Sequence, residues 1–366
     1  MRLLVTGGGT GGHVYPLVAV LQHLAAAQNL QLTNDVLYIG RAASVEEKIA
    51  SEWNIPFAGI QVGGIRSKGA LTQARNVSHM AQAARTAGAA IEHFKPNIVL
   101  ATGGYVSAPV LWAAWRKKIP IVIELPDLEP GWAIQTTWHL SKQIAVSFDE
   151  ALKFFARGRA TVTGYPVRAE FFQATREQGY AHFHLAEKFP TVTLFGGSQG
   201  AHALNEAVRM NLRELLRMTQ LIHICGTNDQ PQLEAERAAL ETEFAARYHV
   251  YDYLNEAMPL ALAAADVVVA RAGAATLGEF PAVGVPSILV PGLFAQGHQT
   301  KNADFMTTRG AAIKLSEGNL ADAFVSTLLK LLDDPARLKT MRAAAKNLAR
   351  PDATERVSAL LFEYAH

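Results

Sequence analysis

A short apolar strand followed at once by a glycine-rich turn and a helical pattern occurs twice in this chain of 366 residues. The first copy is MRLLVTGGGTGGH at the N-terminus, and the second is TVTLFGGSQGAHALNEAV, which begins at residue 191. Further apolar runs alternate with helical patterns: DVLYIG, IVLATGG and IPIVIEL in the first half, then LIHICG, ADVVVARAG and PSILVPG in the second. Strands that alternate with helices form parallel βαβ units. The pattern predicts an α/β protein with two Rossmann-like domains, each built on a parallel sheet, facing a cleft between them.

The segment GYPVRAEFF at residues 164–172 contains Gly and Pro, follows the strand-like run ATVTG, and is typical of a linker. We therefore expect one domain over residues 1–163 and a second over residues 164–349. In the first domain, the apolar spacing after the glycine turn predicts a helix over about residues 16–27, beginning at Pro16.

The composition limits the class of protein and its partners. Lys and Arg number 34 against 32 Asp and Glu, so the net charge of +2 predicts no nucleic-acid partner. The single cysteine, Cys225, excludes an internal disulfide, fits a reducing cytoplasm, and is expected to be a buried apolar residue. The N-terminus does not resemble a signal peptide, and no apolar run approaches the roughly 18 residues that span a bilayer. We expect a cytoplasmic protein whose membrane contact, if any, is local.

The two glycine turns indicate phosphate chemistry. Glycines let a ligand approach the backbone, and the helix that follows presents free N–H groups and the positive end of its dipole to an anion. Tight packing of strand against helix is the alternative reason for one such turn, but a pair favours a phosphate site. Neither turn is a clean GxGxxG dinucleotide fingerprint or a Walker A loop, because no Lys-Ser/Thr follows either one. A ligand with a diphosphate, as in a nucleotide-sugar enzyme, fits best. The sequence has no HxxxH, DxD or cysteine pair, so we expect no metal and no cofactor.

Several motifs resemble one known family. GGGTGGHVYPLVAV, GGIRSKG, ATGGYVSAPVLWAAW, GYPVR, GGSQGAHALNEAV, YLNEAMPLALAAADVVVARAGAATLGE and GHQTKNA occur in the order typical of the MurG family of bacterial glycosyltransferases, in glycosyltransferase family 28. The resemblance implies a GT-B fold and inverting, metal-independent transfer of N-acetylglucosamine from UDP-N-acetylglucosamine to lipid I in peptidoglycan synthesis. It also implies that the first domain takes the acceptor and faces the membrane, while the second holds the nucleotide. The tail PDATERV resembles the family's closing helix, expected over about residues 350–366 and packed back on the first domain.

The resemblance also implies a set of donor-binding residues. Ser198 and its neighbours match the phosphate loop, the Leu254 backbone matches the position that reads uracil, and Glu279 matches the carboxylate that binds the ribose hydroxyls. His298 and Gln299 match the sugar contacts, and Arg168 matches a linker arginine near the nucleotide. The complete expected donor set is Thr10, Gly11, Gly12, Asp127, Arg168, Ser198, Gln199, Gly200, Leu254, Glu279, His298 and Gln299. Without the resemblance, we would expect Glu279 to be an exposed helix residue and Gln299 to cap a loop. We would expect Arg168 to be solvated or to form an interdomain ion pair.

His13 is the ionisable group of the first turn. A helix N-terminus disfavours a cationic histidine, so a neutral imidazole there could act as the catalytic base toward an acceptor hydroxyl. Alternatively, His13 orients the loop or binds the acceptor's diphosphate. Gly8 and Gly9 are expected to belong to the acceptor cradle.

The first domain also offers a candidate membrane surface. Trp112 and Trp115 stand three positions apart before Arg116, Lys117 and Lys118. Indoles favour the headgroup level and cations favour anionic lipid, although buried core tryptophans are an equal alternative. The remaining acceptor or membrane candidates are Arg66, Lys68 and Tyr105, with Arg75 nearby, and a charge run of this kind is also typical of solvated surface.

One loop departs from the family pattern. Family members generally carry His-Glu-Gln-Asn after the strand that reads IPIVIE here, whereas this chain has Glu124, Leu125, Pro126 and Asp127. Only Asp127 could replace the family's asparagine, which touches the transferred sugar, and it lacks the amide donor. Two alternatives stay open: a transferase that uses another lipid-linked or small acceptor, and a UDP-sugar protein that binds or epimerises without transfer.

Overall fold

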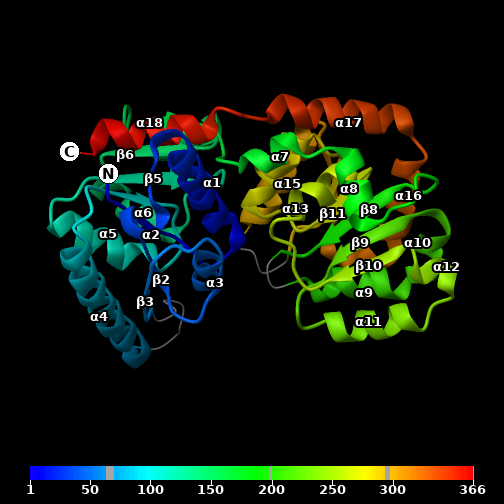
Figure 1. Ribbon diagram of the computed structural model, residues 1–366, viewed down its shortest axis with the longest axis horizontal. Coiled ribbons are helices and arrows are strands. Elements are labelled where there is room, and N and C mark those ends of the chain that lie inside the picture. The colour runs from blue at the N-terminus through cyan, green and yellow to red at the C-terminus, as the bar shows by residue number, and fades with distance from the viewer. Residues whose placement is uncertain (63–69, 198–199, 293–296, 366) are drawn as a thin grey trace. The chain divides into compact units, whose positions relative to one another are not determined.

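The computed structural model describes residues 1–62, 70–197, 200–292 and 297–365, with the backbone alone for residues 70–77 (Figure 1). The chain forms two compact units. Unit 1 consists of Met1–Arg168 and Arg350–His366, and unit 2 is Ala169–Ala349.

Unit 1 is built on a seven-stranded sheet in which every pair is parallel. The order is β3-β2-β1-β4-β5-β6-β7, so the chain reverses its direction of growth between β1 and β4. In doubly wound sheets ligands bind outside the carboxyl ends of the strands at such a reversal. The strands are β1 (Leu3–Thr6), β2 (Val36–Arg41), β3 (Phe57–Ile60), β4 (Ile98–Ala101), β5 (Ile121–Leu125), β6 (Gln143–Val146) and β7 (Ala160–Val162).

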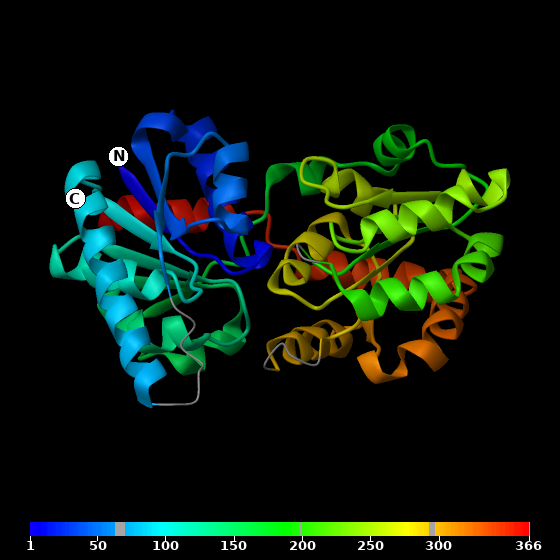
Figure 2. The same ribbon diagram turned by 90° about the horizontal axis from the view of Figure 1, so that it is seen from below.

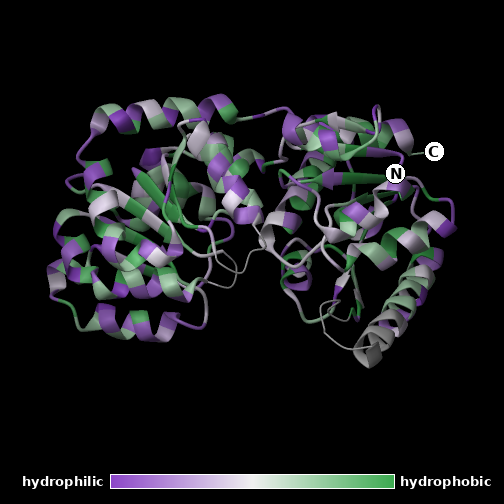
Figure 3. Cartoon of the chain, turned by 180° about the vertical axis from the view of Figure 1, so that it is seen from behind, coloured by the Kyte–Doolittle hydropathy of each residue, from purple (hydrophilic) through white to green (hydrophobic). Residues whose placement is uncertain are grey.

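Helices cover both faces of the unit 1 sheet, as parallel sheets require. Leu3 and Val5 of β1 pack with α1, α3 and α18, whereas Leu4 between them packs with α4 and α5. Figure 3 shows the resulting pattern, with apolar strands inside each unit. The helices are α1 (Gly11–Gln28), α2 (Leu32–Asp35), α3 (Val45–Glu52), α4 (Ala70–Phe94), α5 (Ser107–Arg116), α6 (Trp132–Thr137) and α18 (Ala353–Tyr364), with 3₁₀ turns η1 (Trp138–Leu140) and η2 (Asp149–Phe154).

Helix α1 begins five residues earlier than the sequence pattern predicts. It starts at Gly11 and contains Pro16 in its second turn. Proline has no N–H, so it cannot donate to the carbonyl four residues before it, which belongs to Gly12. The hydroxyl of Tyr165 donates to that carbonyl at 3.2 Å instead. A tertiary contact from a distant residue therefore supports the early start, and local propensity does not reveal it.

The division between the units falls after Arg168, five residues beyond the predicted boundary. Tyr165 bonds Gly12, and the Arg168 guanidinium lies over the Tyr15 ring, so both side chains stay with unit 1. Helix α18, red in Figures 1 and 2, packs on α1 and contributes Val357 and Leu361 to the core of unit 1.

Unit 2 repeats the same topology with six parallel strands in the order β10-β9-β8-β11-β12-β13. The strands are β8 (Thr191–Phe195), β9 (Gln220–Ile224), β10 (Tyr248–Tyr251), β11 (Val267–Ala270), β12 (Ser287–Leu289) and β13 (Ala312–Lys314). The helices are α7 (Ala169–Gln173), α8 (Arg176–Phe183), α9 (His202–Met210), α10 (Leu212–Met218), α11 (Gln230–Ala238), α12 (Thr242–Ala245), α13 (Met258–Ala264), α14 (Glu279–Val283), α15 (His298–Thr308), α16 (Leu320–Leu332) and α17 (Pro335–Leu348), with 3₁₀ turns η3 (Ala274–Leu277) and η4 (Glu317–Asn319). The predicted α/β architecture with two parallel sheets is confirmed.

Candidate functional site

The first glycine turn lies at the carboxyl edge of the unit 1 sheet and is closed on one side. A Cβ on Gly8 would lie 2.5 Å from Oε1 of Glu46, and a Cβ on Gly104 would lie 2.3 Å from the Gly8 carbonyl oxygen. Gly9 has a φ of +91°, which favours glycine, and a Cβ there would meet nothing within 4 Å. The turn is therefore packed tightly at Gly8 and open at Gly9, where a ligand can approach the backbone.

His13 stands in the first turn of α1 with both ring nitrogens near polar groups. Its Nδ1 lies 3.1 Å from the Thr10 hydroxyl, and its Nε2 lies 3.4 Å from Oδ2 of Asp127. The Thr102 hydroxyl, at the end of β4, donates to the His13 carbonyl at 2.5 Å. The structure thus brings together His13 and Asp127, two residues that the sequence places in different roles.

Two carboxyl groups lie in different environments at the carboxyl end of β5, Glu124 within the strand and Asp127 just after it. Glu124 is buried, and burial raises the pKa of its carboxyl well above its usual range. The Ser147 hydroxyl, which donates to Glu124 Oε1 at 3.3 Å, opposes that rise, and the nearby charge of Asp127 adds to it. Burial therefore favours the protonated form of Glu124, whereas Asp127 lies nearer the surface with 14% of its side chain exposed.

Arg168 is buried, with 4% of it exposed, and its guanidinium lies 4.8 Å from the centroid of the Tyr15 ring. This stacking belongs wholly to unit 1. The structure therefore favours a packed arginine over the solvated alternative.

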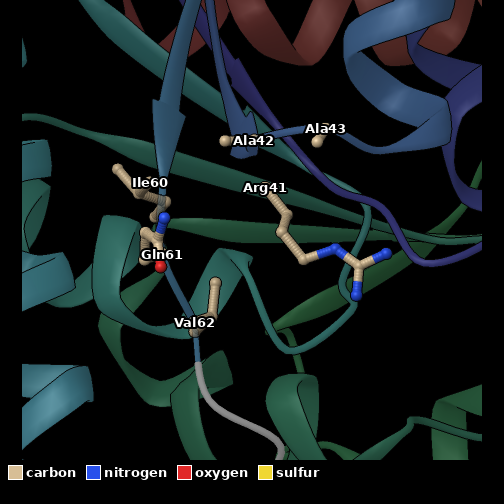
Figure 4. Close-up of a pocket in the computed structure, with 6 residues that line it drawn as sticks. All are labelled: Arg41, Ala42, Ala43, Ile60, Gln61 and Val62. Atoms are coloured by element: carbon tan, nitrogen blue, oxygen red, sulfur yellow. The ribbon is translucent and has the colours of Figure 1, made fainter.

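A cavity of about 370 Å³ opens beside the carboxyl ends of β2 and β3 (Figure 4). Its lining residues are Arg41, Ala42, Ala43, Ile60, Gln61 and Val62. The Arg41 side chain extends away from the β3 residues, and its backbone N–H donates to Glu46 Oε1 at 3.3 Å. The cavity adds a cation to the same sheet edge that carries the first glycine turn.

The predicted membrane residues of α5 are exposed, which excludes the alternative that they are core tryptophans. Trp112 is 44% exposed and Trp115 is 50% exposed, and the Arg116 guanidinium lies 5.0 Å from the Trp112 ring. Tyr105 is also exposed and lies against Trp132, with ring centroids 5.8 Å apart. The other candidates, Arg66 and Lys68, lie outside the described residues, as does the Arg75 side chain. Among the helices described, none is long and apolar enough to cross a membrane.

The second glycine turn, at the end of β8, is backed by a buried polar network. Ser198 and Gln199 lie outside the described residues, but Gly200 has a φ of +76°, and a Cβ there would lie 2.2 Å from the Cys225 carbonyl oxygen. The Asn205 amide of α9 donates to that same carbonyl at 2.8 Å. His223 lies 3.0 Å from Asn205 Oδ1, and burial lowers the pKa of His223 to about 4, so its ring is neutral. These contacts fix the start of α9 against β9.

Cys225 is buried and free, as predicted, and burial raises the pKa of its thiol to about 11. The residue acts as a packed apolar group, and its carbonyl, rather than its sulfur, supports the turn.

The remaining donor candidates of unit 2 lie near the carboxyl ends of β10, β11 and β12. Glu279 is the first residue of α14 and is 7% exposed, so the exposed-helix alternative is wrong. His298 begins α15, and Leu254 lies in the segment between β10 and α13. Oε1 of Gln299 accepts the Gly292 N–H at 2.8 Å, which confirms its loop-capping contact. Within the described part of the chain, no cluster of three potential metal ligands occurs.

Comparison with known proteins covers both units. The glycosyltransferase family 28 N-terminal domain matches residues 3–146, and the C-terminal domain of that family matches residues 191–357. A UDP-N-acetylglucosamine--N-acetylmuramyl-(pentapeptide) pyrophosphoryl-undecaprenol N-acetylglucosamine transferase from Roseiflexus sp. (strain RS-1) is 35% identical, over 99% of this chain and 94% of the relative. The transferase of the same name from Bacillus licheniformis is 35% identical, over 100% of this chain and 99% of the relative. The chain belongs to glycosyltransferase family 28.

Solved structures agree with the family-28 assignment. The crystal structure of Acinetobacter baumannii MurG matches with a TM-score of 0.72 and 26% identity, covering 99% of each chain. A UDP-GlcNAc 2-epimerase from Neisseria meningitidis matches with a TM-score of 0.67 at 14% identity, over 99% of this chain and 100% of the epimerase, which shows the fold alone. The family-28 chain has the GT-B fold, and it is a glycosyltransferase.

The structure adds residues that sequence reasoning did not select for this family-28 site. Glu46 closes the first turn beneath Gly8, Thr102 holds the His13 carbonyl, and Arg41 ends β2 at the same edge. Arg41 could have been found, because it directly follows a predicted strand and the carboxyl ends of parallel strands share an edge. Thr102 carries the same signal, because it directly follows β4, whereas Glu46 of α3 carries none, since its partner Gly8 is distant in sequence.

Proposed function

We propose that this chain transfers N-acetylglucosamine from UDP-N-acetylglucosamine to lipid I, with inversion and without a metal ion. The observation that carries the proposal is the match, along nearly the whole chain, to relatives named for this transfer. Both the acceptor unit and the donor unit are covered by the family.

Unit 2 is proposed to hold the donor. The start of α9 and the glycine turn before it receive the diphosphate, because helix N-termini present free N–H groups to anions. The buried carboxylate of Glu279 accepts hydrogen bonds from the ribose hydroxyls, and the Leu254 backbone reads the uracil edge. The amide nitrogen of Gln299, whose oxygen accepts the Gly292 N–H, donates to the sugar. Ser198, Gln199 and His298 complete the unit 2 part of the proposed donor set.

Unit 1 is proposed to hold the acceptor through the open part of its glycine turn at Gly9, whereas Thr10, Gly11 and Gly12 keep their expected place in the donor set. The imidazole of His13 accepts the proton of the attacking hydroxyl. The hydroxyl oxygen forms the new bond to the anomeric carbon, and the bond from that carbon to the diphosphate breaks with its electron pair leaving on UDP. A single displacement of this kind inverts the anomeric centre.

Exposed aromatic and basic groups of unit 1 support peripheral binding to an anionic membrane surface, where a lipid-linked acceptor resides. Trp112 and Trp115 offer two indoles, and Arg116 follows them on α5. We propose a cytoplasmic enzyme at the inner face of the membrane, with no nucleic-acid partner. Replacing both tryptophans by alanine is expected to weaken binding to phosphatidylglycerol vesicles, while UDP affinity stays unchanged.

One incubation separates this function from its alternatives. Purified protein is mixed with UDP-N-acetylglucosamine, with and without lipid I, and the products are resolved by mass spectrometry and by sugar analysis. Transfer that depends on lipid I supports the proposal. If the protein transfers the sugar only to a different lipid-linked or small acceptor, which the changed loop at Glu124–Asp127 allows, then lipid I is the wrong acceptor. If the protein forms the C2 epimer without any acceptor, then it is not a transferase.

A further inference from the structure

The carboxylate of Asp127 faces the imidazole of His13 across the carboxyl edge of the unit 1 sheet. Oδ2 of Asp127 lies 3.4 Å from Nε2 of His13, and the two side chains are 14% and 23% exposed. Partial shielding from water strengthens an interaction between opposite charges at this distance.

Several contacts fix this pair in place. The Thr10 hydroxyl engages the other ring nitrogen at 3.1 Å, and the Thr102 hydroxyl holds the His13 backbone. Asp127 follows β5 by two residues, and Pro126 between them restricts the backbone torsion before it. The imidazole therefore cannot turn away from the carboxylate without losing its contact with Thr10.

Other carboxyl groups at this edge do not compete for His13. Glu124 of β5 is buried and accepts from the Ser147 hydroxyl at 3.3 Å, and burial raises the pKa of its carboxyl. Glu46 of α3 lies beneath Gly8. In the described part of the chain, Asp127 supplies the carboxylate that lies within ion-pair distance of the His13 ring.

We infer that Asp127 is a positioning residue for His13, and this inference rests on the proposed transfer reaction. When the acceptor hydroxyl attacks the anomeric carbon, its proton moves to the imidazole, and the bond from that carbon to UDP breaks with its electron pair leaving on UDP. The carboxylate then stabilises the imidazolium that has formed and keeps the ring oriented. An amide at the same position would supply no charge.

This role differs from the sugar contact that the family resemblance implies for position 127. A carboxylate beside the departing diphosphate would repel it, whereas the same carboxylate beside a developing cation is favourable. The family's asparagine supplies an amide that contacts the sugar. Asp127 instead supplies a carboxylate that orients the imidazole of His13 and stabilises its positive charge.

The test combines kinetics with a measurement that needs no catalysis. Asp127→Asn, His13→Ala, the double variant and the control Asp149→Asn, an exposed aspartate of η2, are assayed with UDP-N-acetylglucosamine and a short-chain lipid I analogue. We expect Asp127→Asn to lower kcat by roughly 10- to 1000-fold, with donor KM within about twofold. In the His13→Ala background the same change should alter kcat by less than about twofold, because the group it serves is gone. Asp149→Asn should match the wild type.

Nitrogen-15 NMR of the histidine rings reads the pair directly. The ring nitrogen shifts of His13 should change in Asp127→Asn, while those of His23, on the same helix, stay fixed. The inference would be overturned by unchanged His13 shifts or by kinetic losses that are additive in the double variant. It would also be overturned by an intact kcat with a raised donor KM, which would show that Asp127 contacts the sugar of the donor instead. If the wild type transfers no sugar to the analogue, the proposed function fails, and the nitrogen shifts alone then decide whether the pair exists.

Discussion

Replacing Gly104 by alanine tests the packing that closes the first glycine turn. Gly104 has a φ of +80°, and an added Cβ would lie 2.3 Å from the Gly8 carbonyl oxygen. An alanine in the left-handed region costs about 1–2 kcal/mol relative to glycine. The contact is far shorter than any van der Waals approach, so the backbone must shift, which adds about 1–3 kcal/mol. We therefore expect unit 1 to lose about 2–5 kcal/mol of unfolding free energy.

The control for this substitution is Gly158→Ala. Gly158 has a φ of +82°, but a Cβ there would meet nothing within 4 Å, so the variant carries the backbone strain without the clash. We expect it to lose only about 1–2 kcal/mol. The difference between the two variants then measures the close approach of Gly104 to Gly8.

Urea denaturation followed by tryptophan fluorescence measures the unfolding of unit 1 alone. All five tryptophans of the chain lie between residues 53 and 138, within unit 1. Gly104→Ala should show a clearly lower midpoint than Gly158→Ala, and a lower transfer rate because Gly8 is displaced. Equal stability losses in the two variants would refute the reasoning, since they would show that the Gly8 contact has no energetic weight.

Three further outcomes are expected. Glu279→Ala should weaken UDP binding by about 1–3 kcal/mol in calorimetry, because the ribose hydroxyls lose a charged acceptor; unchanged affinity would contradict this role. The unfolded chain protonates His223 near pH 6.5, but the folded pKa is about 4. Stability of unit 2, followed by circular dichroism, should therefore fall by about 3 kcal/mol as the pH drops through that window, and His223→Gln should remove this share. Burial raises the pKa of Glu124, so its effect has the opposite sign: stability is lost as the pH rises above the unfolded value, and Glu124→Gln should be more stable than the wild type at pH 8 but not at pH 4.

The fold could be predicted to a large extent because the signal is local. The strands β1, β2, β4 and β5 of unit 1 and β8, β9, β11 and β12 of unit 2 coincide with apolar runs in the sequence. The missed strands are short or mixed in polarity: β3 reads FAGI, β6 reads QIAV, β10 reads YHVY and β13 reads AIK. Their pairing with β2, β5, β9 and β12 decides their conformation, and no local pattern encodes that pairing.

For the candidate site, the sequence predicts the positions of the backbone elements but not the contacts between side chains. The glycine turns and the residues at the carboxyl ends of strands follow from the βαβ pattern, so His13 could be placed at a helix start. Its proximity to Asp127 could not, because more than one hundred residues separate them and β4 lies between their strands. Likewise, the burial of Glu279 depends on what packs over α14, which its own segment does not specify.

The two glycine turns share a topology but differ in what lies behind them, and this difference supports the proposed division of roles. Behind the first turn is a carboxyl group, since Glu46 lies against Gly8, and Asp127 stands beside the helix start. Behind the second turn, Gly200 packs on the Cys225 carbonyl, which the Asn205 amide holds in place. A carboxylate lies here too, but Asp229 accepts from the same Asn205 amide at 2.6 Å and lies 3.2 Å from Nδ1 of His202 at the start of α9, so polar side chains engage its charge and a diphosphate is repelled less. At the first turn, the carboxylate of Asp127 faces the ring of His13 and favours the positive charge that the imidazole gains when it accepts a proton.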